Sequence, residues 1–489
     1  METRLRAFQY VTEGRKARGY GGNVVASDYR GPILISGGRV IDPWQNLDAT
    51  GDVLLQDGRV AWTHVGADST PDIPAGTQRL DAAGMIVAPG FIDLHCHLRE
   101  PGQEHKETIE SGTRAAARGG FTTVCAMPNT EPPLDTAERV SYVVDRARES
   151  ACVHVLPIGT ITVGRAGREL ADLSTLAMAG AALLSDDGTA VANDDVMRAA
   201  FLESARLGLP LSQHSEDPEI IGNAVAHEGE AARKLGLPSA PAEAETSIVE
   251  RDLRLLAEAG GHLHVAHVST AGAAELLRDA RERGLSVTSE VTPHHLTLTD
   301  RALLGERGPQ YGWPNGPVAD TSLRVNPPIR SKEHVNAMVD ALREGVIDAI
   351  ATDHAPHSAQ DKAGAFVDAA PGISVFETSF GLLMTGLVHT GQLDLPTLIE
   401  RLTLGPAKII SSAADALGLR GLTPGAAADV VVLDPDRAWT VRADNFLSRG
   451  RNTPLEGCAL RGMVTHTFVG GVPVYTAEEQ SVAHGAARS

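Results

Sequence analysis

The sequence predicts an α/β fold: a (β/α)8 barrel of the TIM type, joined to a small β-sandwich that both ends of the chain build. Three observations support this expectation. Eight short apolar runs alternate with Ala-, Arg- and Glu-rich helical stretches over roughly 270 residues, an ordinary size for such a barrel. Strand-like segments with turn signals stand on both sides of this region. No glycine-rich fingerprint follows the first run, which argues against a doubly wound nucleotide-binding sheet.

Composition narrows the possible classes of protein. The 489 residues are 42% hydrophobic and 21% charged, with a formal net charge of −19. These values are ordinary for a globular protein and exclude a mainly disordered chain or a coiled coil. The acidic balance argues against nucleic acid or an anionic membrane as the main partner, although one arginine in a cleft can still hold an anionic small molecule. No apolar run approaches the roughly 18 residues of a membrane span.

The first residues and the cysteines indicate the compartment. The amino-terminal stretch has no apolar core of the kind that a secretory signal needs. The four cysteines lack the spacing of a zinc ribbon and are too sparse for a disulfide scaffold: Cys96, Cys125, Cys152 and Cys458. We therefore expect a cytoplasmic protein in a reducing compartment.

Five segments are expected along the chain. The first is rich in Arg and Gly and lacks periodicity, which is typical of a poorly ordered extension. Short strands divided by turn signals such as Asp57-Gly58 follow it, and similar strands return near the carboxyl end. The segments are an amino-terminal extension (1–31), the first part of the β-sandwich (32–85), the barrel (86–404), the second part of the β-sandwich (405–475) and a tail (476–489).

The barrel strands can be named in order from their apolar runs. They are GFIDLHCH, FTTVCAMPN, CVHVLPIG, AALLSDDG, LPLSQHSE, HLHVAHVS, LSVTSEVTPHH and IDAIATDHAPH. Helical stretches such as ESGTRAAARGG and TAGAAELLRDARERG lie between them. Before the eighth run, residues 305–322 are rich in Gly and Pro and predict a long loop.

Polar side chains gather at the carboxyl ends of these runs, where a barrel carries its active site. His95 and His97 alternate on the first strand, so they share one face and can form a two-point metal clip. By itself His-x-His is weak, because strand histidines are common. Asp186 and Asp187 end the fourth run before Gly188, where a turn with a helix cap is an equal interpretation.

The remaining candidates give the pattern its weight. His214 and His267 end the fifth and sixth runs, and Asp353 ends the eighth, four residues before His357. Any one of these histidines is more often a satisfied core residue, but five strand ends of one barrel now carry ligand-type groups. Nitrogen and oxygen donors without thiolate suit zinc and related ions. Six ligands exceed one tetrahedral site and fit two metals bridged by a carboxylate and a hydroxide.

Six longer motifs carry a resemblance to a known family: GFIDLHCHLREPG, AMPNT, SEVTPHH, RVNPPIR, ATDHAPH and FLSRGRNTPLEG. From Pro32 to Tyr475 the chain resembles the amidohydrolase superfamily and, within it, the dihydroorotases of the bacterial class I type. RVNPPIR and the last motif separate dihydroorotases from their cousins. The resemblance implies a zinc-dependent cyclic amidohydrolase that interconverts N-carbamoyl-L-aspartate and (S)-dihydroorotate in de novo pyrimidine (UMP) biosynthesis.

The resemblance also implies roles for single residues. Two Zn2+ ions per chain are expected, one on His95 and His97 and the other on His214 and His267. Asp353 is implied as a ligand and as the general acid/base for a hydroxide that the two ions share. The implied substrate contacts are His97, Arg99, Asn129, Asn326, His357 and the backbone of Pro371 and Gly372. The chain reads AAPGIS in this last stretch, where the family usually has an aromatic residue before glycine.

A missing lysine identifies the expected bridging ligand. Many relatives bridge the two metals with a carboxylated lysine, yet no lysine occurs between Lys106 and Lys234. The Asp186-Asp187 pair is the only acidic candidate at the fourth strand end, and the family spacing to His214 favours Asp187. Asp186 is then a turn residue or a neighbour of the ligands. The absence of the lysine argues against hydantoinases and allantoinases.

Other polar residues near the strand ends are expected to have structural roles. His294 and His295 follow the seventh strand, and Lys362 belongs to the last barrel motif. His262 and His264 differ in parity from His267, so we expect them to face the helices rather than the metals. Cys96 should point outward for the same reason.

Two rival functions remain open on the sequence. One is a hydantoinase- or allantoinase-type cyclic amidohydrolase, which needs no carboxylate clamp of the kind that Arg99 offers. The other is a non-catalytic assembly partner, which predicts that ligands are lost, whereas all six positions are filled here. Family habit suggests a homodimer or a complex with aspartate transcarbamoylase, with a small molecule as the substrate.

Overall fold

A computed structural model describes residues 31–66 and 71–477 of the chain. The extension that the sequence predicts at the amino end, apart from Gly31, and nearly all of the predicted tail lie outside these residues. Within the described ranges, no helix is long and apolar enough to cross a membrane.

The barrel contains all eight strands that the sequence predicts. Neighbouring strands are parallel and follow chain order around the ring. Between the last strand and the first, the ring closes through two backbone bonds of 2.9 Å, from His97 N to His354 O and from Asp353 N to His95 O. The strands are β6 (Phe91–Cys96), β7 (Phe121–Ala126), β8 (His154–Gly159), β9 (Leu183–Leu184), β10 (Leu211–Gln213), β13 (Leu263–Val265), β14 (Val287–Val291) and β15 (Ala349–Ile350). The predicted (β/α)8 fold is thereby confirmed.

Helices surround the strands, and several of them begin at side chains that cap them. Thr108 and Ser111 form a reciprocal capping box at the start of α2, and Asn193 accepts two backbone N–H bonds at the start of α5. The helices are α2 (Ile109–Arg118), α3 (Ala137–Ser150), α4 (Leu173–Ala179), α5 (Asp194–Leu207), α6 (Pro218–Ile221), α7 (Glu230–Leu235), α8 (Glu243–Ala259), α9 (Ala271–Glu282), α10 (Pro293–Thr297), α11 (Lys332–Glu344), α12 (Phe376–Leu383), α13 (Leu395–Leu402), α14 (Leu404–Ile409) and α15 (Ser411–Leu417).

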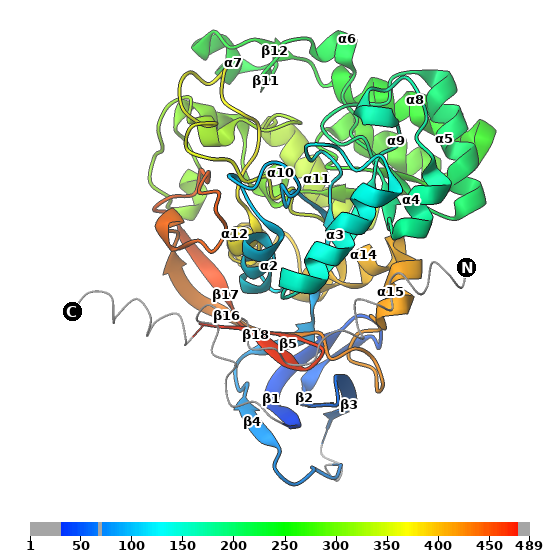
Figure 1. Cartoon of the computed structure of the whole chain (residues 1–489). Coiled ribbons are helices and arrows are strands. Elements are labelled where there is room, and N and C mark those ends of the chain that lie inside the picture. The colour runs from blue at the N-terminus through cyan, green and yellow to red at the C-terminus, as the bar shows by residue number, and fades with distance from the viewer. Residues whose placement is uncertain (1–30, 67–70, 478–489) are drawn as a thin grey trace.

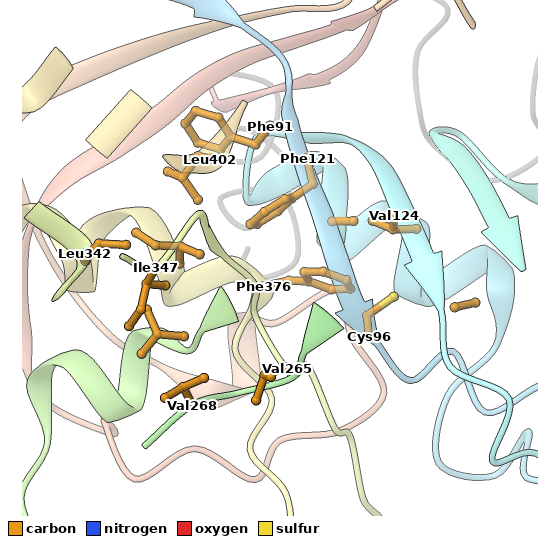
Figure 2. Packing of buried hydrophobic residues seen from close by; sticks show 14 of the residues in the cluster. Phe91, Cys96, Phe121, Val124, Val265, Val268, Leu342, Ile347, Phe376 and Leu402 are labelled. Atoms are coloured by element: carbon orange, nitrogen blue, oxygen red, sulfur yellow. The ribbon is translucent and has the colours of Figure 1, made fainter. Parts of the chain in front are cut away.

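The main core fills the space between the strands and these helices. Phe91, Phe121 and Phe376 are fully buried, and Figure 2 shows their rings following one another along β6 toward Cys96. The ring centroids lie 5.7 Å apart for Phe91 and Phe121 and 5.4 Å apart for Phe121 and Phe376, ordinary distances for attractive aromatic pairs. Cys96 belongs to this outer core, as its parity in the strand predicts.

The interior of the barrel is apolar at one end and polar at the other. Ile92, Leu94 and Leu183 point inward and pack with residues of α14 and α15, which cover the end where the strands begin. Because this end is filled with hydrocarbon, a polar cavity can form only where the strands finish. The sequence interpretation assigned residues from 405 onward to the second sheet, but these two helices pack on the barrel, so we propose a boundary after residue 417.

Both chain ends form one continuous second sheet of eight strands, seen below the barrel in Figure 1. The order is β18-β17-β16-β5-β1-β2-β3, and β4 also pairs with β1. These strands are β1 (Ile33–Asp42), β2 (Leu47–Gln56), β3 (Arg59–Val65), β4 (Gln78–Asp81), β5 (Ile86–Pro89), β16 (Val430–Thr440), β17 (Ala459–Val469) and β18 (Val472–Thr476). Because β5 joins β1 to β16, we propose that the first part extends to Pro89 rather than ending at residue 85.

Two excursions from the barrel lie near the strand ends that carry polar residues. Between β10 and α8 the chain forms α6, α7 and a small parallel pair, β11 (Ala226–His227) and β12 (Ser239–Ala240), at the far end of the molecule from the second sheet (Figure 1). The predicted loop at 305–322 contains two short 3-10 turns, η3 (Pro309–Tyr311) and η4 (Thr321–Leu323). Trp313 anchors this loop to the carboxyl-terminal part, because its Nε1 donates a bond of 2.8 Å to Ala459 O.

Candidate active site

Four histidines and two aspartates from five strand ends meet in one buried cluster. Their side chains are at most 9% exposed. Within the cluster two groups of donor atoms lie close enough to share an ion: one formed by His95, Asp187 and His267, and one formed by His95, His97 and Asp353. The two groups share His95, so together they describe adjacent positions rather than distant ones.

The carboxylate of Asp187 lies at the centre of the cluster. Its Oδ1 lies 3.3 Å from His95 Nε2 and 3.6 Å from both His214 Nδ1 and His267 Nε2. Its Oδ2 lies 3.6 Å from His97 Nε2. Oδ1 therefore faces His214 and His267 as well as His95, and Oδ2 faces His97. A carboxylate placed between two pairs of histidines in this way has the position that a bridging ligand requires.

The arrangement of the donor atoms suits binding of divalent metal ions better than hydrogen bonding among the side chains themselves. His95 Nε2 is buried and has no hydrogen-bond partner among the described residues. His214 Nδ1 and His267 Nε2 face each other at 2.9 Å, an arrangement that two neutral imidazoles can satisfy with only one proton. Buried imidazole nitrogens turned toward one centre, with carboxylates beside them, form a donor set typical of zinc sites.

Asp186 and Asp187 are adjacent in the chain but have different surroundings. Asp186 turns away from the histidines and accepts backbone N–H bonds from Ile161 at 2.8 Å and from Thr162 at 3.0 Å. It also accepts the hydroxyl of Thr162. Asp186 therefore shapes the turn that presents Asp187, and of the two only Asp187 faces the histidines.

The backbone itself is strained where it presents these groups. Arg99, His267 and Asp353 have positive φ angles of 60°, 34° and 48°. Residues with a β-carbon avoid this region, at a cost on the order of 1–3 kcal/mol each, and such strain gathers at functional sites. Here three strained residues from three strand ends surround one cavity, so the fold maintains their side-chain directions against local preference.

His97 and Asp187 are also joined through Asn129. The ring nitrogen Nδ1 of His97 lies 2.8 Å from Asn129 Oδ1, and Asn129 Nδ2 donates to Asp187 Oδ2 at 3.1 Å. Asn129 thus fixes the ring of one candidate ligand and one oxygen of another.

The predicted substrate residues line a cavity of about 170 Å3 beside the cluster. Arg99 is 8% exposed, and its Nε donates to Pro356 O at 3.3 Å while its Nη2 lies 3.3 Å from His357 Nε2. Burial lowers the pKa of Arg99 to about 10, so it remains a cation at neutral pH. The lining residues include His97, Arg99, Asn129, Asp187, His214, His267, Asn326, Asp353, His357, Pro371 and Gly372.

Asp353 is held as a carboxylate within this cavity. Burial alone raises the pKa of such a group, but the bond with His97, 3.1 Å from its Oδ1, and the neighbouring imidazoles together lower the pKa well below its usual value. An ionised carboxylate beside the cluster can accept a proton.

The structure adds a residue that the sequence interpretation did not single out. Asn452, in the last motif, accepts from His357 N at 2.9 Å and from Ser374 Oγ at 2.8 Å, and it donates to Ala355 O and Gly372 O. It therefore joins the two ends of the loop between β15 and α12, which carries His357, Pro371 and Gly372. Its place in a family motif was the available signal.

Lys362 and His295 support the same cavity from behind. Lys362 Nζ donates to Ala370 O at 2.6 Å and to Arg324 O at 3.3 Å, just before the Pro371-Gly372 turn. His295 Nε2 lies 3.1 Å from Pro327 O, next to Asn326. Both residues have the structural roles expected from the sequence.

One expectation from strand parity is wrong. His264 does not face the helices: its Nε2 lies 3.1 Å from Glu290 Oε2, and Glu290 Oε1 lies 2.8 Å from His95 Nδ1. His262 likewise contacts Thr288 on the neighbouring strand β14, at 2.8 Å. The parity rule failed because β13 ends at Val265 and His267 adopts a positive φ, so alternation does not continue to His267.

A second cavity of about 450 Å3 adjoins the first and shares Gly188, His214 and Asn326 with it. Glu216 and Arg324 give it one charge of each sign. Glu216 Oε2 lies 2.9 Å from His214 Nε2, on the side of that ring opposite Asp187. The second cavity is therefore continuous with the site.

Comparison with known proteins agrees with this description. A family model described as dihydro-orotase-like matches residues 84–273. The chain is 47% identical over 439 residues to the dihydroorotase of Anaeromyxobacter dehalogenans (strain 2CP-1), which covers 90% of this chain and 96% of that protein. It is 43% identical to the dihydroorotase of Syntrophus aciditrophicus over 91% of this chain and 99% of that protein.

Solved structures give more distant matches over most of the chain. The L-hydantoinase (dihydropyrimidinase) of Arthrobacter aurescens aligns with a TM-score of 0.79 at 26% identity, covering 91% of this chain and 96% of that one. A dihydropyrimidinase from Brevibacillus agri aligns with a TM-score of 0.75 at 22% identity over 91% and 95% of the two chains, which shows a shared fold. Since relatives with 43–47% identity span nine-tenths of its length, the chain belongs to the dihydroorotase family of amidohydrolase enzymes.

Proposed function

We propose that this enzyme is a zinc-dependent dihydroorotase that reversibly interconverts (S)-dihydroorotate and N-carbamoyl-L-aspartate in de novo pyrimidine synthesis. One observation carries the proposal: the Asp187 carboxylate lies among four imidazoles in the same cavity as the buried Arg99 guanidinium. A site for cations and a site for a carboxylate are thus side by side. Relatives named dihydroorotase, with up to 47% identity, support the same assignment.

Six residues would hold two zinc ions. His95, His97 and Asp353 would hold one, and His214 and His267 the other, with Asp187 between them. When bound, such ions lower the pKa of an attacking water and polarise a ring carbonyl. The donor atoms form two groups that share only His95, which supports two adjacent ions rather than one.

Asp353 would move the proton during ring opening. Its carboxylate lines the cavity beside the histidines, so it can take a proton from the attacking water and pass it to the departing ring nitrogen. In the direction of ring closure the same carboxyl group would return that proton. Its positive φ of 48° aims the side chain at the cluster and supports this role.

Arg99 would select the substrate through its carboxylate. A guanidinium pairs with a carboxylate at two points, which an ammonium group cannot copy. Asn129, Asn326 and His357 line the same cavity and offer further polar contacts. The backbone at Pro371 and Gly372 would lie over the ring, because Gly372 N is fixed by Arg324 O at 2.7 Å.

The test is a direct assay of ring opening with dihydroorotate, hydantoin and allantoin side by side, on protein whose metal content has been measured. We expect about two zinc ions per chain and turnover of dihydroorotate far above that of the two uncharged rings. Hydantoin as the preferred substrate would contradict the proposed specificity. A stable, metal-free and inactive protein would instead indicate a non-catalytic assembly partner.

A hydantoinase-type activity is the second candidate, because the L-hydantoinase of Arthrobacter aurescens shares the fold with a TM-score of 0.79. Two features argue against it here. Arg99 is buried in the cavity, and the carboxylated lysine expected of hydantoinases has no counterpart between Lys106 and Lys234.

Location and assembly also stand as proposals. A reduced cytoplasm is supported by the small number of cysteines in the sequence. A homodimer, or a complex with aspartate transcarbamoylase, can be tested by light scattering on the purified protein with and without that enzyme.

A further inference from the structure

The candidate ligand His95 is the end of a chain of hydrogen bonds that runs through the barrel interior. His95 Nδ1 lies 2.8 Å from Glu290 Oε1, and Glu290 Oε2 lies 3.1 Å from His264 Nε2. His264 Nδ1 lies 3.0 Å from Thr288 Oγ1, which in turn lies 2.8 Å from His262 Nε2. The chain crosses strands β6, β14 and β13, and its three inner residues, His95, Glu290 and His264, are at most 1% exposed.

The donors and acceptors of this chain agree with one another in a single direction. An ionised carboxylate only accepts, so both His95 Nδ1 and His264 Nε2 must carry protons toward Glu290. With His264 neutral, its Nδ1 accepts the hydroxyl proton of Thr288. Thr288 Oγ1 then accepts the proton of His262 Nε2. No bond in the chain needs a second proton or lacks one.

With the hydrogen bonds in this direction, Nε2 of His95 keeps the lone pair that can bind a cation. A neutral imidazole has one protonated nitrogen and one lone pair. With its proton on Nδ1, His95 turns the lone pair of Nε2 toward Asp187 Oδ1 at 3.3 Å and Asp353 Oδ1 at 3.6 Å. Carboxylates that accept from the remote nitrogen of a metal-bound histidine fix its tautomer and raise its basicity.

We propose that Glu290, fixed by His264 and Thr288, is a positioning residue that fixes the ring orientation and tautomer of His95 and thereby sets the affinity of the site for zinc. The inference rests on the proposed function, because it requires His95 to be a metal ligand. It assigns a role to the glutamate of the motif SEVTPHH and to a histidine that sequence parity placed outside the barrel.

The other histidines of the cluster are fixed differently, which makes Glu290 a distinct target. His97 hydrogen-bonds through Nδ1 to the neutral amide of Asn129. His267 Nδ1 is buried without a hydrogen-bond partner among the described residues. His214 leans on Glu216, which borders the adjoining cavity and has one unpartnered oxygen. Glu290 alone among these contacts is a carboxylate with both oxygens engaged by imidazoles.

The test compares zinc affinity in three variants by competition with a chelator, alongside thermal unfolding of the metal-free forms. Glu290→Gln should weaken zinc binding roughly 10- to 100-fold, the usual effect of losing such a partner. Thr288→Val, nearly isosteric, should weaken it less but measurably, because His264 loses the donor that fixes its tautomer. Asp42→Asn is the matched control, because it removes the charge of another buried carboxylate at the end of β1 in the second sheet. This carboxylate accepts backbone N–H bonds from Trp44 and Leu422.

The outcomes separate this inference from the proposed function. If the wild-type protein binds no zinc, the proposed function and the positioning role are both overturned. If the wild type binds zinc and both Glu290→Gln and Thr288→Val bind it equally tightly, only the positioning role is overturned. Should Glu290→Gln fail to fold, Thr288→Val still decides, and a cobalt-substituted spectrum that differs from the wild type in that variant, but not in Asp42→Asn, supports the proposal.

Discussion

In the proposed function, Arg99 is the residue through which the enzyme would distinguish an acidic ring from a neutral one. Replacing it with Lys keeps the charge but removes the two-point geometry, which is worth about 1.5–3 kcal/mol for a hydrogen bond to a charged group. We expect Arg99→Lys to raise the KM for dihydroorotate roughly 10- to 100-fold while zinc content stays at the wild-type level. Steady-state kinetics with parallel metal analysis measures both quantities, and unchanged kinetics would remove Arg99 from the substrate contacts.

Asn452 is the second residue for which the structure supports a prediction, because its side chain hydrogen-bonds to both His357 and Gly372. Asn452→Ala leaves buried polar groups without partners, at a cost of about 1–3 kcal/mol. We expect a lower melting temperature and an unchanged zinc content. We also expect kcat/KM to fall about tenfold, a ratio that corresponds to a free-energy loss within this range.

Asn445→Ala is the control for this variant, since Asn445 is an exposed asparagine in the same connection between β16 and β17. It should match the wild type in both measurements. If Asn452→Ala loses stability but keeps its kinetics, the residue has a structural role and does not position the substrate contacts.

Single residues also show what sequence reasoning can reach. The metal-type ligands could be predicted because His and Asp at strand ends are unusual and recur at five ends of one barrel. The role of Asn452 could not, because its partner His357 is 95 positions away and an asparagine in a loop has many ordinary uses.

At the scale of elements, the loop from Asp353 to Gly372 depends on Lys362. Its buried Nζ spans two carbonyl oxygens, of Ala370 and Arg324, and burial lowers its pKa to about 7. An unfolded lysine has a pKa of about 10.4, so between these values the unfolded chain binds more protons than the folded one. The free energy of unfolding therefore rises with pH over this window. This contribution of Lys362 to stability is lost as the pH falls through about 7.

We accordingly expect the unfolding free energy of the wild type, relative to Lys362→Met, to increase between pH 7 and pH 9. Urea titrations at several pH values measure this difference. Lys408→Met, on an exposed position of α14, is the control and should show no such trend. A difference that is flat or falls with pH would contradict the depressed pKa of Lys362.

Elements also show where pattern rules fail. Strand parity correctly placed Cys96 in the outer core, because its neighbours His95 and His97 both turn toward the cluster of histidines and aspartates. The same rule misplaced His264, because β13 has only three residues and the chain turns before His267. Periodicity is a local rule, and the functional groups of this barrel lie at or just beyond the strand ends, where bulges and turns interrupt the alternation.

For the whole molecule, zinc is expected to act as part of the fold. The cluster gathers four histidines and two carboxylates from strands spread between residues 91 and 353, so ions bound there join distant parts of the barrel. A ligand that binds only the native state at 100 times its dissociation constant stabilises it by about 2.7 kcal/mol. We expect removal of zinc by a chelator to abolish activity and lower the melting temperature by several degrees, as calorimetry can measure.

Added zinc should restore both properties in the wild type. Asp187→Asn is the matched variant, because it keeps the shape of the side chain and removes the charge of the proposed bridging ligand. We expect its melting temperature to respond weakly to zinc. A full response in this variant would mean that Asp187 does not hold the ions together.

The sequence by itself determined the barrel with its eight strands, the second sheet built from both chain ends, and the residue types of the site. These features follow from periodicity, turn residues and strand-end chemistry, which are written locally along the chain. Only the tertiary structure decided which of Asp186 and Asp187 faces the histidines, that His264 points inward to Glu290, and that Asn452 joins the two ends of the loop between β15 and α12. These choices depend on contacts between strands and loops far apart in the sequence, and on backbone turns at positive φ that no local pattern predicts.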